Sequence, residues 1–132
     1  MQVLLSLSAF CTYFFIGIAM IGAFLFIYTK ITPHNEWQLI SNDNLAAALA
    51  FSGTIIGYVI PLSSAAINAV SITDYIIWGV IALIVQLLVY GGVRIYMPKL
   101  SEKIIHRNLA AGLFMGTAAL AGGIFNAACM TW

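Results

Sequence analysis

Charged side chains are scarce in this sequence, and their scarcity excludes a water-soluble fold. Lys, Arg, Asp and Glu together make up 7% of the 132 residues, whereas 63% are hydrophobic. Soluble domains carry roughly a quarter charged residues, because their surfaces must be covered by groups that water solvates. A chain with so little polar surface is expected to lie in a lipid bilayer.

Cysteine is nearly absent too, with Cys11 and Cys129 as the two examples in the chain. Two cysteines are too few for a disulfide framework. Both lie in apolar surroundings, where a thiol usually behaves as a small hydrophobic side chain. A bridge between them is the less favoured alternative, because both would have to face an oxidising compartment.

Motifs for catalysis, phosphate binding and nucleic-acid binding are also missing. There is no phosphate loop and no basic patch, and the pair Ser63 and Ser64 has no base nearby in the sequence. The long apolar runs contain no Asp, Glu, Lys or Arg of the kind that forms proton relays. The sequence therefore predicts no enzyme activity, no cofactor and no nucleic-acid partner.

Two histidines raise the question of a metal site. His34 and His106 lie one in each of two connecting segments, with Glu36 and Glu102 nearby. A zinc site needs three or four ligands that converge in space, whereas loop residues usually face water. We therefore interpret both histidines as solvated loop residues and predict no metal.

Four long uncharged runs are present instead. They are Met1 to Thr29, Asn44 to Thr73, Tyr75 to Val93 and Asn108 to Trp132. A helix needs about 20 apolar residues to cross the hydrocarbon, so each run accommodates one span. The first run lacks a basic start and exceeds the roughly 7–15 apolar residues of a signal-peptide core, so we expect it to be retained. The sequence predicts an all-α integral membrane protein with four transmembrane helices in a single domain, residues 1–132.

The basic residues predict the orientation of these spans. The segment from Lys30 to Asp43 and the segment from Arg94 to Arg107 hold all five Lys and Arg residues, and the turn from Ser71 to Asp74 holds none. Basic loops stay in the cytoplasm. We therefore expect both long loops to be cytoplasmic and the N-terminus, the Ser71–Asp74 turn and the C-terminal Trp132 to be periplasmic.

An internal repeat is the next feature of the sequence. A shift of 63 residues aligns Ala47, Ala48, Phe51, Gly53 and Thr54 with Ala110, Ala111, Phe114, Gly116 and Thr117, and a shift of 62 aligns Tyr13 and Gly17 with Tyr75 and Gly79. Such a period indicates a duplicated unit, although small-residue membrane helices also resemble one another by composition. We predict two repeats, about 4–70 and 75–132. Because each crosses the membrane twice, both have the same orientation.

Each predicted repeat also contains a proline after its first span. Pro33 and Pro98 precede short amphipathic stretches, His34 to Ile40 and Lys99 to Ile105. Proline suits the first turn of a helix. We therefore expect two short interfacial segments in the cytoplasmic loops, with Trp37 at the depth of the lipid headgroups.

Small residues form stripes on the predicted helices. At 100° per residue, one stripe on the second span carries Gly53, Gly57, Pro61, Ser64 and Asn68. One stripe on the fourth span carries Gly112, Gly116, Ala119, Gly123 and Asn126. Glycines four residues apart allow two membrane helices to approach closely. We expect these stripes to pack against protein. We expect the same of a face of the third span that carries Gly79, Ala82, Gln86 and Tyr90. A face of the first span that carries Tyr13, Gly17, Phe24 and Tyr28 should also pack against protein.

Polar side chains on the stripes admit two interpretations. Asn68, Asn126, Gln86 and Ser64 must find partners, since an unpaired amide in hydrocarbon costs several kcal/mol. The favoured interpretation is hydrogen bonding between helices. The alternative is a polar path lined by Asn68 and Asn126. Pro61 frees the carbonyl of Gly57 in either case, and a polar group or a packing kink would accommodate it.

Long strings of this sequence resemble a known family. HNEWQLI, LAFSGT, GYVIPLSSAAINAVS, YMPKLSEKII and GTAALAGGIFNAACMTW are similar to the YjfL-type bacterial inner-membrane proteins, a domain of unknown function numbered 350 that is built from two-span repeats. The resemblance covers essentially the whole chain. It implies a multi-pass protein of the bacterial inner membrane, and it provides no catalytic residues.

Two functions remain open. The favoured one is a non-catalytic accessory or scaffold subunit that forms a homo-oligomeric helix bundle in the lipid bilayer and holds a further membrane or envelope protein. The other is a small oligomeric channel or transport-like pore near Asn68 and Asn126. The absence of charge in the spans argues against an ion-coupled transporter.

Overall fold

Four long helices and two short helices form the fold of residues 1–130, which the computed structural model describes. They are α1 (Gln2–Ile31), α2 (Glu36–Ser41), α3 (Leu45–Asn68), α4 (Ile72–Tyr96), α5 (Leu100–Ile105) and α6 (Leu109–Cys129). No strand occurs in this range. The long helices α1, α3, α4 and α6 are each long and apolar enough to cross a membrane. The all-helical class and the four spans are confirmed.

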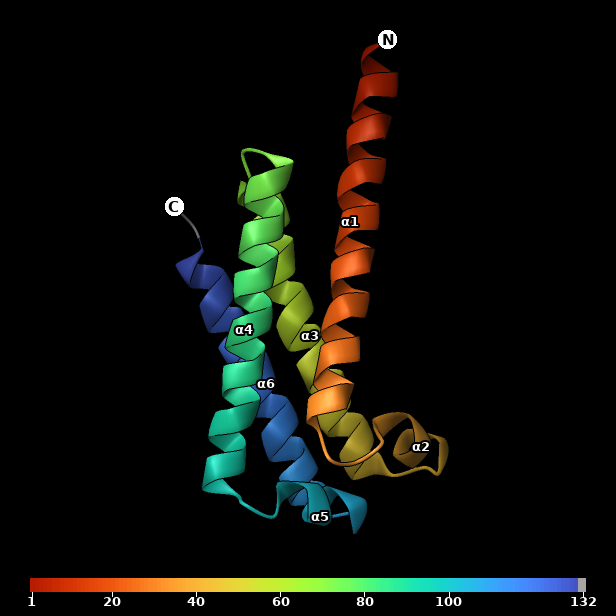
Figure 1. Ribbon diagram of the computed structural model, residues 1–132, viewed down its shortest axis with the longest axis vertical. Helices are drawn as coiled ribbons and strands as arrows, with labels where there is room; N and C mark the ends of the chain where they lie inside the picture. The colour runs from red at the N-terminus through yellow and green to blue at the C-terminus, as the bar shows by residue number, and fades with distance from the viewer. Residues whose placement is uncertain (131–132) are drawn as a thin grey trace.

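The most extensive contact joins α3 to α6, which are far apart in the sequence. The two helices run side by side in Figure 1, with α4 packed against both. α3 is the central helix, since it buries its glycine face against α6 and also buries Phe51, Tyr58 and Leu62. The core of the bundle therefore surrounds α3.

The first helix, α1, lies at the edge of the bundle. It buries three residues, Gly17, Phe24 and Tyr28. These are three of the four residues predicted to face protein on the first span, and the fourth, Tyr13, is half-buried. The rings of Phe24 and Tyr58 stack at 4.5 Å between centroids, which holds the second half of α1 against α3. The N-terminal end of α1 extends past the ends of α3 and α4 (Figure 1).

Two turns with the same backbone geometry lead into α3 and α6. Asp43 and Arg107 both adopt positive φ, 61° and 63°, and the next residue, Asn44 or Asn108, caps the long helix by accepting a hydrogen bond from the backbone three residues on. A left-handed residue ends a helix, and an Asn at the next N-cap satisfies one of its free N–H groups. This likeness agrees with a duplicated unit, which stays a prediction.

These two turns lie against each other. The Arg107 guanidinium donates to the carbonyl oxygens of Asp43 and Asn42, at 2.9 and 2.8 Å. In the other direction, the Asn44 amide donates to the carbonyl of Ile104 at 2.8 Å. The hydrogen bonds link the two halves of the chain reciprocally at this end of the bundle.

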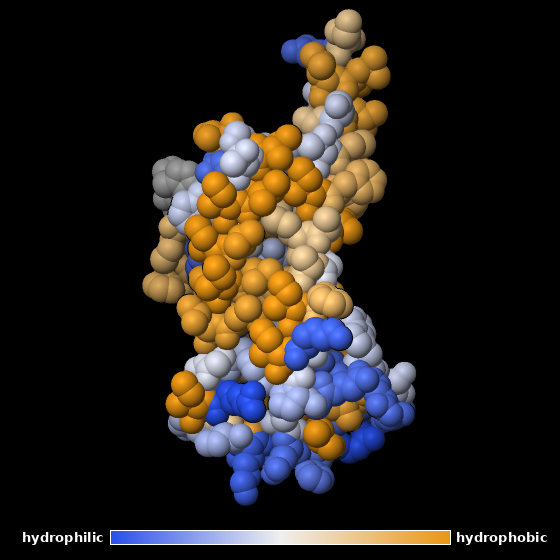
Figure 2. Space-filling view, viewed as in Figure 1, coloured by the Kyte–Doolittle hydropathy of each residue, from blue (hydrophilic) through white to orange (hydrophobic). Residues whose placement is uncertain are grey.

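Polar surface gathers where α2 and α5 lie. Figure 2 shows hydrophilic side chains at that end and a hydrophobic surface over the long helices. We call it the α2/α5 end. Both expected interfacial segments are short helices there, and Trp37 is 57% exposed while its ring contacts Phe51 edge-on.

Candidate functional site

The glycines of the two stripes lie at the contact between α3 and α6. A Cβ atom at Gly53 would collide with the backbone of Gly116, and one at Gly123 would collide with the backbone of Gly57. The backbones of Ala46 and Ala119 occupy the same position beside Gly112 and Gly57. A larger residue at these positions would therefore have to push the two helices apart.

Asn68 and Ser64 lie near the end of α3, where Ser64 connects α3 to α6. The Asn68 amide donates to the backbone carbonyl and the hydroxyl of Ser64, at 2.9 and 3.3 Å. The Ser64 hydroxyl in turn donates to the carbonyl of Ala127 on α6 at 3.2 Å. Asn126 is half-buried on α6, and its amide nitrogen has no hydrogen-bond partner among the described residues. Asn68 and Asn126 thus have different surroundings.

Gln86 lies at the junction of three helices. It is 1% exposed, and its amide nitrogen donates to the carbonyl oxygens of Gly57 on α3 and Ala119 on α6, at 3.0 and 3.1 Å. Pro61 lies four residues after Gly57 and has no N–H to donate to that carbonyl. Gln86 therefore replaces the helical hydrogen bond that Pro61 removes, which is how a proline can sit inside a membrane helix.

A second polar cluster lies at the α2/α5 end, and it was not predicted from the sequence. The prediction that both histidines are solvated is wrong for His34, which is 8% exposed. Glu36 is 2% exposed. These side chains follow α1 directly, where Glu36 contacts Thr32 and His34 contacts Ser101 of α5. His106 is exposed, as expected.

Four side chains form this cluster, which we call the Glu36 cluster: Thr32, His34, Glu36 and Ser101. The Thr32 hydroxyl donates to Glu36 Oε1, and His34 Nε2 lies 3.4 Å from the same oxygen. His34 Nδ1 lies 3.0 Å from the hydroxyl of Ser101 on α5. The second carboxyl oxygen, Glu36 Oε2, is buried and has no hydrogen-bond partner within the described part of the chain. The cluster joins the end of α1 to α5 and leaves one strong acceptor unused.

Burial sets the charge of this cluster. Removal from water raises the pKa of Glu36 above its ordinary 4.5, and the hydrogen bond from Thr32 only partly opposes this shift. Burial also lowers the pKa of His34 below its ordinary 6.5. Both shifts favour the uncharged form of each side chain.

A small cavity adjoins the cluster from outside. It measures about 300 Å³, and its lining includes Lys30, Asn35 and Trp37 together with Thr32, His34 and Glu36. Within residues 1–130, no three His, Cys, Asp or Glu side chains come together as a metal site would require. The cavity therefore brings a cation, an aromatic ring and the buried carboxyl to one place at the polar end.

Buried polar groups continue from this end into the bundle. The Tyr28 hydroxyl accepts a hydrogen bond from Thr54 at 3.5 Å, and the Tyr28 and Tyr90 rings meet edge to face at 5.4 Å. Tyr90 lies one turn from Gln86 on the same face of α4. The Tyr90 hydroxyl and Gln86 Oε1 are both buried, and neither has a hydrogen-bond partner in the range 1–130. Buried groups of this kind usually bond to protein or ordered water.

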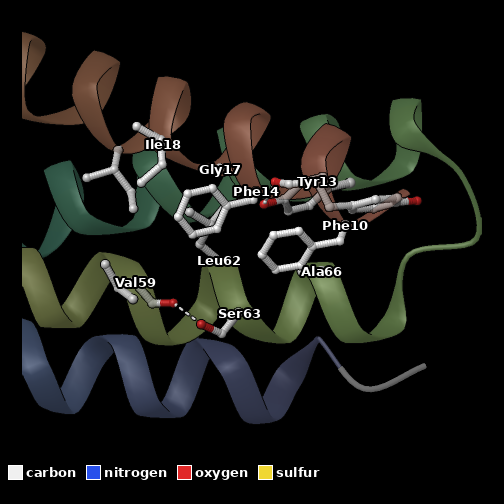
Figure 3. A pocket seen from close by; sticks show the side chains of 11 residues that line it. Phe10, Tyr13, Phe14, Gly17, Ile18, Val59, Leu62, Ser63 and Ala66 are labelled. Atoms are coloured by element: carbon white, nitrogen blue, oxygen red, sulfur yellow. Dashed lines mark hydrogen bonds between the residues drawn. The ribbon is translucent and has the colours of Figure 1, made fainter. Parts of the chain in front are cut away.

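An apolar groove of about 290 Å³ lies at the other end, between α1 and α3. Phe10 and Phe14 reach from α1 toward Leu62 and Ala66 of α3 in Figure 3. The hydroxyl of Ser63 in the groove donates to the Val59 carbonyl of its own helix at 2.8 Å. The residues that line the groove are mostly apolar, and none of them is charged.

The comparisons with known proteins give one consistent result. Residues 2–130 match the family model described as Domain of Unknown Function (DUF350). The chain is 76% identical over the full length of both chains to the UPF0719 inner membrane protein YjfL of Escherichia coli K12. It is 26% identical over 76% of each chain to the UPF0719 transmembrane protein YshE of Bacillus subtilis. No solved structure matches it.

Proposed function

Since the chain belongs to the DUF350 family and is a multi-pass inner-membrane protein, we propose that it acts as a non-catalytic accessory or scaffold subunit. In this proposal, copies of the chain form a homo-oligomeric helix bundle in the lipid bilayer, and the bundle holds a further envelope protein. The length and the exposed apolar side chains of α1 are the main support for this proposal.

The N-terminal half of α1 is the observation that carries the proposal. α1 has 30 residues, so it is about 45 Å long, whereas the hydrocarbon is about 30 Å thick. Its exposed side chains include Val3 and Leu5 near the N-terminus and Phe10 and Phe15 further along. A span longer than the bilayer tilts or associates with other helices. The α1 of a second copy has the same length and the same apolar faces, so it is a suitable partner.

The charge distribution supports an orientation for this subunit. All five basic residues lie at the α2/α5 end, on the last turns of α1 and α4 or between α4 and α6. The opposite end of the described bundle carries Asp74 as its charged side chain. Basic loops face the cytoplasm. We therefore propose that the α2/α5 end is cytoplasmic and that both termini are periplasmic; Trp132 itself lies outside the described residues.

Cysteine cross-linking tests the proposed assembly. Cys129 is first replaced by Ala, which leaves Cys11 on α1 as the single cysteine. Further variants combine C11A with a cysteine at Leu7, Phe14 or Phe15. Oxidation in native membranes should link two copies through one face of α1. Leu88→Cys on α4 is the control, because Leu88 is 69% exposed, close to the 66% of Phe15, and lies on a different helix. Equal linking from α4, or a single-chain mass in lipid nanodiscs, would overturn the homo-oligomer.

A polar conduit through the oligomer is the second candidate. The buried and unpaired amide nitrogen of Asn126 favours it, because such a group needs water or a partner from another copy. Replacing Asn126 with Leu should then abolish an ion or solute flux into liposomes while the oligomer stays intact. If the subunit is a scaffold, wild-type liposomes should show no flux beyond that of empty ones.

A further inference from the structure

The structure places an acid and a base together at the α2/α5 end, and we propose that Glu36 and His34 form a proton-binding site. In its stable form the site holds Glu36 protonated and His34 neutral. A change in this protonation state weakens the contact between the α1–α2 connection and α5. The inference does not depend on the oligomer or on the direction in which the bundle lies.

The unused carboxyl oxygen is the first argument. Thr32 and His34 both lie beside Glu36 Oε1, and the buried Oε2 has no hydrogen-bond partner among residues 1–130. A buried carboxylate oxygen without a donor is costly, whereas the protonated carboxyl carries no charge. Binding a proton therefore removes the cost of burying a negative charge at this position.

The accessibility of Glu36 identifies the proton as the ligand. Glu36 is 2% exposed and Oε2 is closed to solvent, so a lipid headgroup or a hydrated ion cannot reach it without rearrangement. Lys30 lines the adjoining cavity and repels metal cations. A proton can arrive through a single water and needs no coordination shell.

The charged groups around Glu36 are the next argument, and His34 is the one described residue that forms an ion pair with it. From α1, Tyr28 and Lys30 lie toward the cluster, and α3 carries no acidic or basic side chain. On the α5 side, Ser101 contacts His34, and Lys99, Glu102 and Lys103 are exposed to solvent. Lys30 lines the adjoining cavity without forming an ion pair with Glu36, so among the described residues His34 is the ion-pair partner of Glu36, and burial disfavours the charged form of His34 as well.

The site is connected to the rest of the fold through His34. Its Nδ1 atom meets the Ser101 hydroxyl, and the two residues are 67 positions apart in the chain. A change of proton on His34 or Glu36 therefore changes a contact between the two halves of the bundle. The expected result is looser packing of the α1–α2 connection against α5 when either group changes its protonation state.

The direction of the pH effect follows from the two shifts. Folding raises the Glu36 pKa above 4.5, so its contribution to stability is present at low pH and is lost as the pH rises through the folded pKa. Folding lowers the His34 pKa below 6.5, so its contribution is present above 6.5 and is lost as the pH falls through the folded pKa. Glu36 should therefore make the melting temperature fall as the pH rises above 4.5, and His34 should make it fall as the pH drops below 6.5. Glu36→Gln should remove the decline on the alkaline side, and His34→Gln should remove the decline on the acid side.

Infrared difference spectroscopy on the protein in lipid nanodiscs tests the site directly. The chain has four acidic residues, so D43N, D74N and E102Q together leave Glu36 as its one acidic side chain. The carboxylic-acid band of this variant should titrate with a midpoint above 4.5. A midpoint at or below 4.5 would overturn the proposal. The measurement retains Glu36, so it does not depend on whether Glu36→Gln folds.

Imidazole titration by NMR provides the second test. The chain has two histidines, so His106→Gln leaves the signal of His34 alone. This signal should titrate below pH 6.5, and Ser101→Ala should alter it while Ser63→Ala should not, because Ser63 bonds within its own helix. A His34 that titrates at or above pH 6.5 and ignores Ser101 would exclude the coupling between the site and α5.

Discussion

At the residue scale, Gln86 illustrates how a polar side chain is used inside this bundle. Its amide nitrogen meets two carbonyl oxygens on two other helices, and one of these carbonyls, that of Gly57, has lost its helical donor to Pro61. The proline and the glutamine are therefore interdependent, although they lie on different spans.

This interdependence predicts a double-mutant result. Gln86→Leu should lower the free energy of unfolding by about 1–3 kcal/mol, because the Gly57 carbonyl is left buried without a donor. In a Pro61→Ala background the backbone N–H at position 61 returns and donates to Gly57, so the same change should cost less. Unfolding in mixed micelles measures both differences. Equal losses in the two backgrounds would show that Gln86 does not compensate for Pro61.

The residue scale is also where sequence reasoning failed most clearly. Gln86 could be assigned to an inward face from its helical phase alone, because the periodicity of a long apolar helix is strong. His34 and Glu36 lie in a short connection, where periodicity gives no information about direction. Their burial arises from a sharp turn after α1 and from contact with α5, and neither is encoded locally.

At the element scale, the close contact of α3 with α6 is the main feature of the packing. Membrane helices gain no hydrophobic energy by leaving lipid, so backbone proximity and van der Waals contact must hold them together. The glycine stripes predict that both helices pack closely against something. They do not reveal that the two stripes meet each other, because small faces on any two spans would be compatible.

Glycine substitutions test this contact. Gly116→Leu should strongly reduce the amount of folded protein, because its Cβ would collide with the backbone of Leu49. Gly22→Leu on α1 is the matched control, since nothing lies within 4 Å of a Cβ there. Fluorescence-detected size exclusion of the solubilised protein compares the two. Similar yields for both variants would mean that α3 and α6 do not pack as described.

At the scale of the whole molecule, the sequence predicts the number of spans well and their arrangement poorly. Hydropathy determines that four helices cross the bilayer, and the distribution of Lys30 and the other basic residues indicates an orientation. Pairings between helices distant in sequence depend on three-dimensional fit. The extension of the N-terminal end of α1 past the ends of α3 and α4 is one such property, and it had no signal in the sequence.

The orientation is open to a direct test with reporter fusions. Alkaline phosphatase fused after Trp132 should be active, because the enzyme folds only in the oxidising periplasm, and a fusion near Lys99 should be inactive. A fusion partner that is active in the cytoplasm should give the opposite pattern at the two sites. Activity of alkaline phosphatase at Lys99 would reverse the orientation.

The reciprocal hydrogen bonds between the two turns have a consequence for how the chain tolerates being cut. The α3–α6 contact joins the two halves of the chain. The hydrogen bonds from Arg107 to the carbonyls of Asp43 and Asn42 also join them. The covalent link between the halves is a short exposed turn near Val70. Segments 1–69 and 70–132, expressed as separate polypeptides, should therefore find each other and co-purify. Arg107→Ala should weaken their reassociation more than it weakens the intact chain, in which the tether keeps the two halves at high effective concentration.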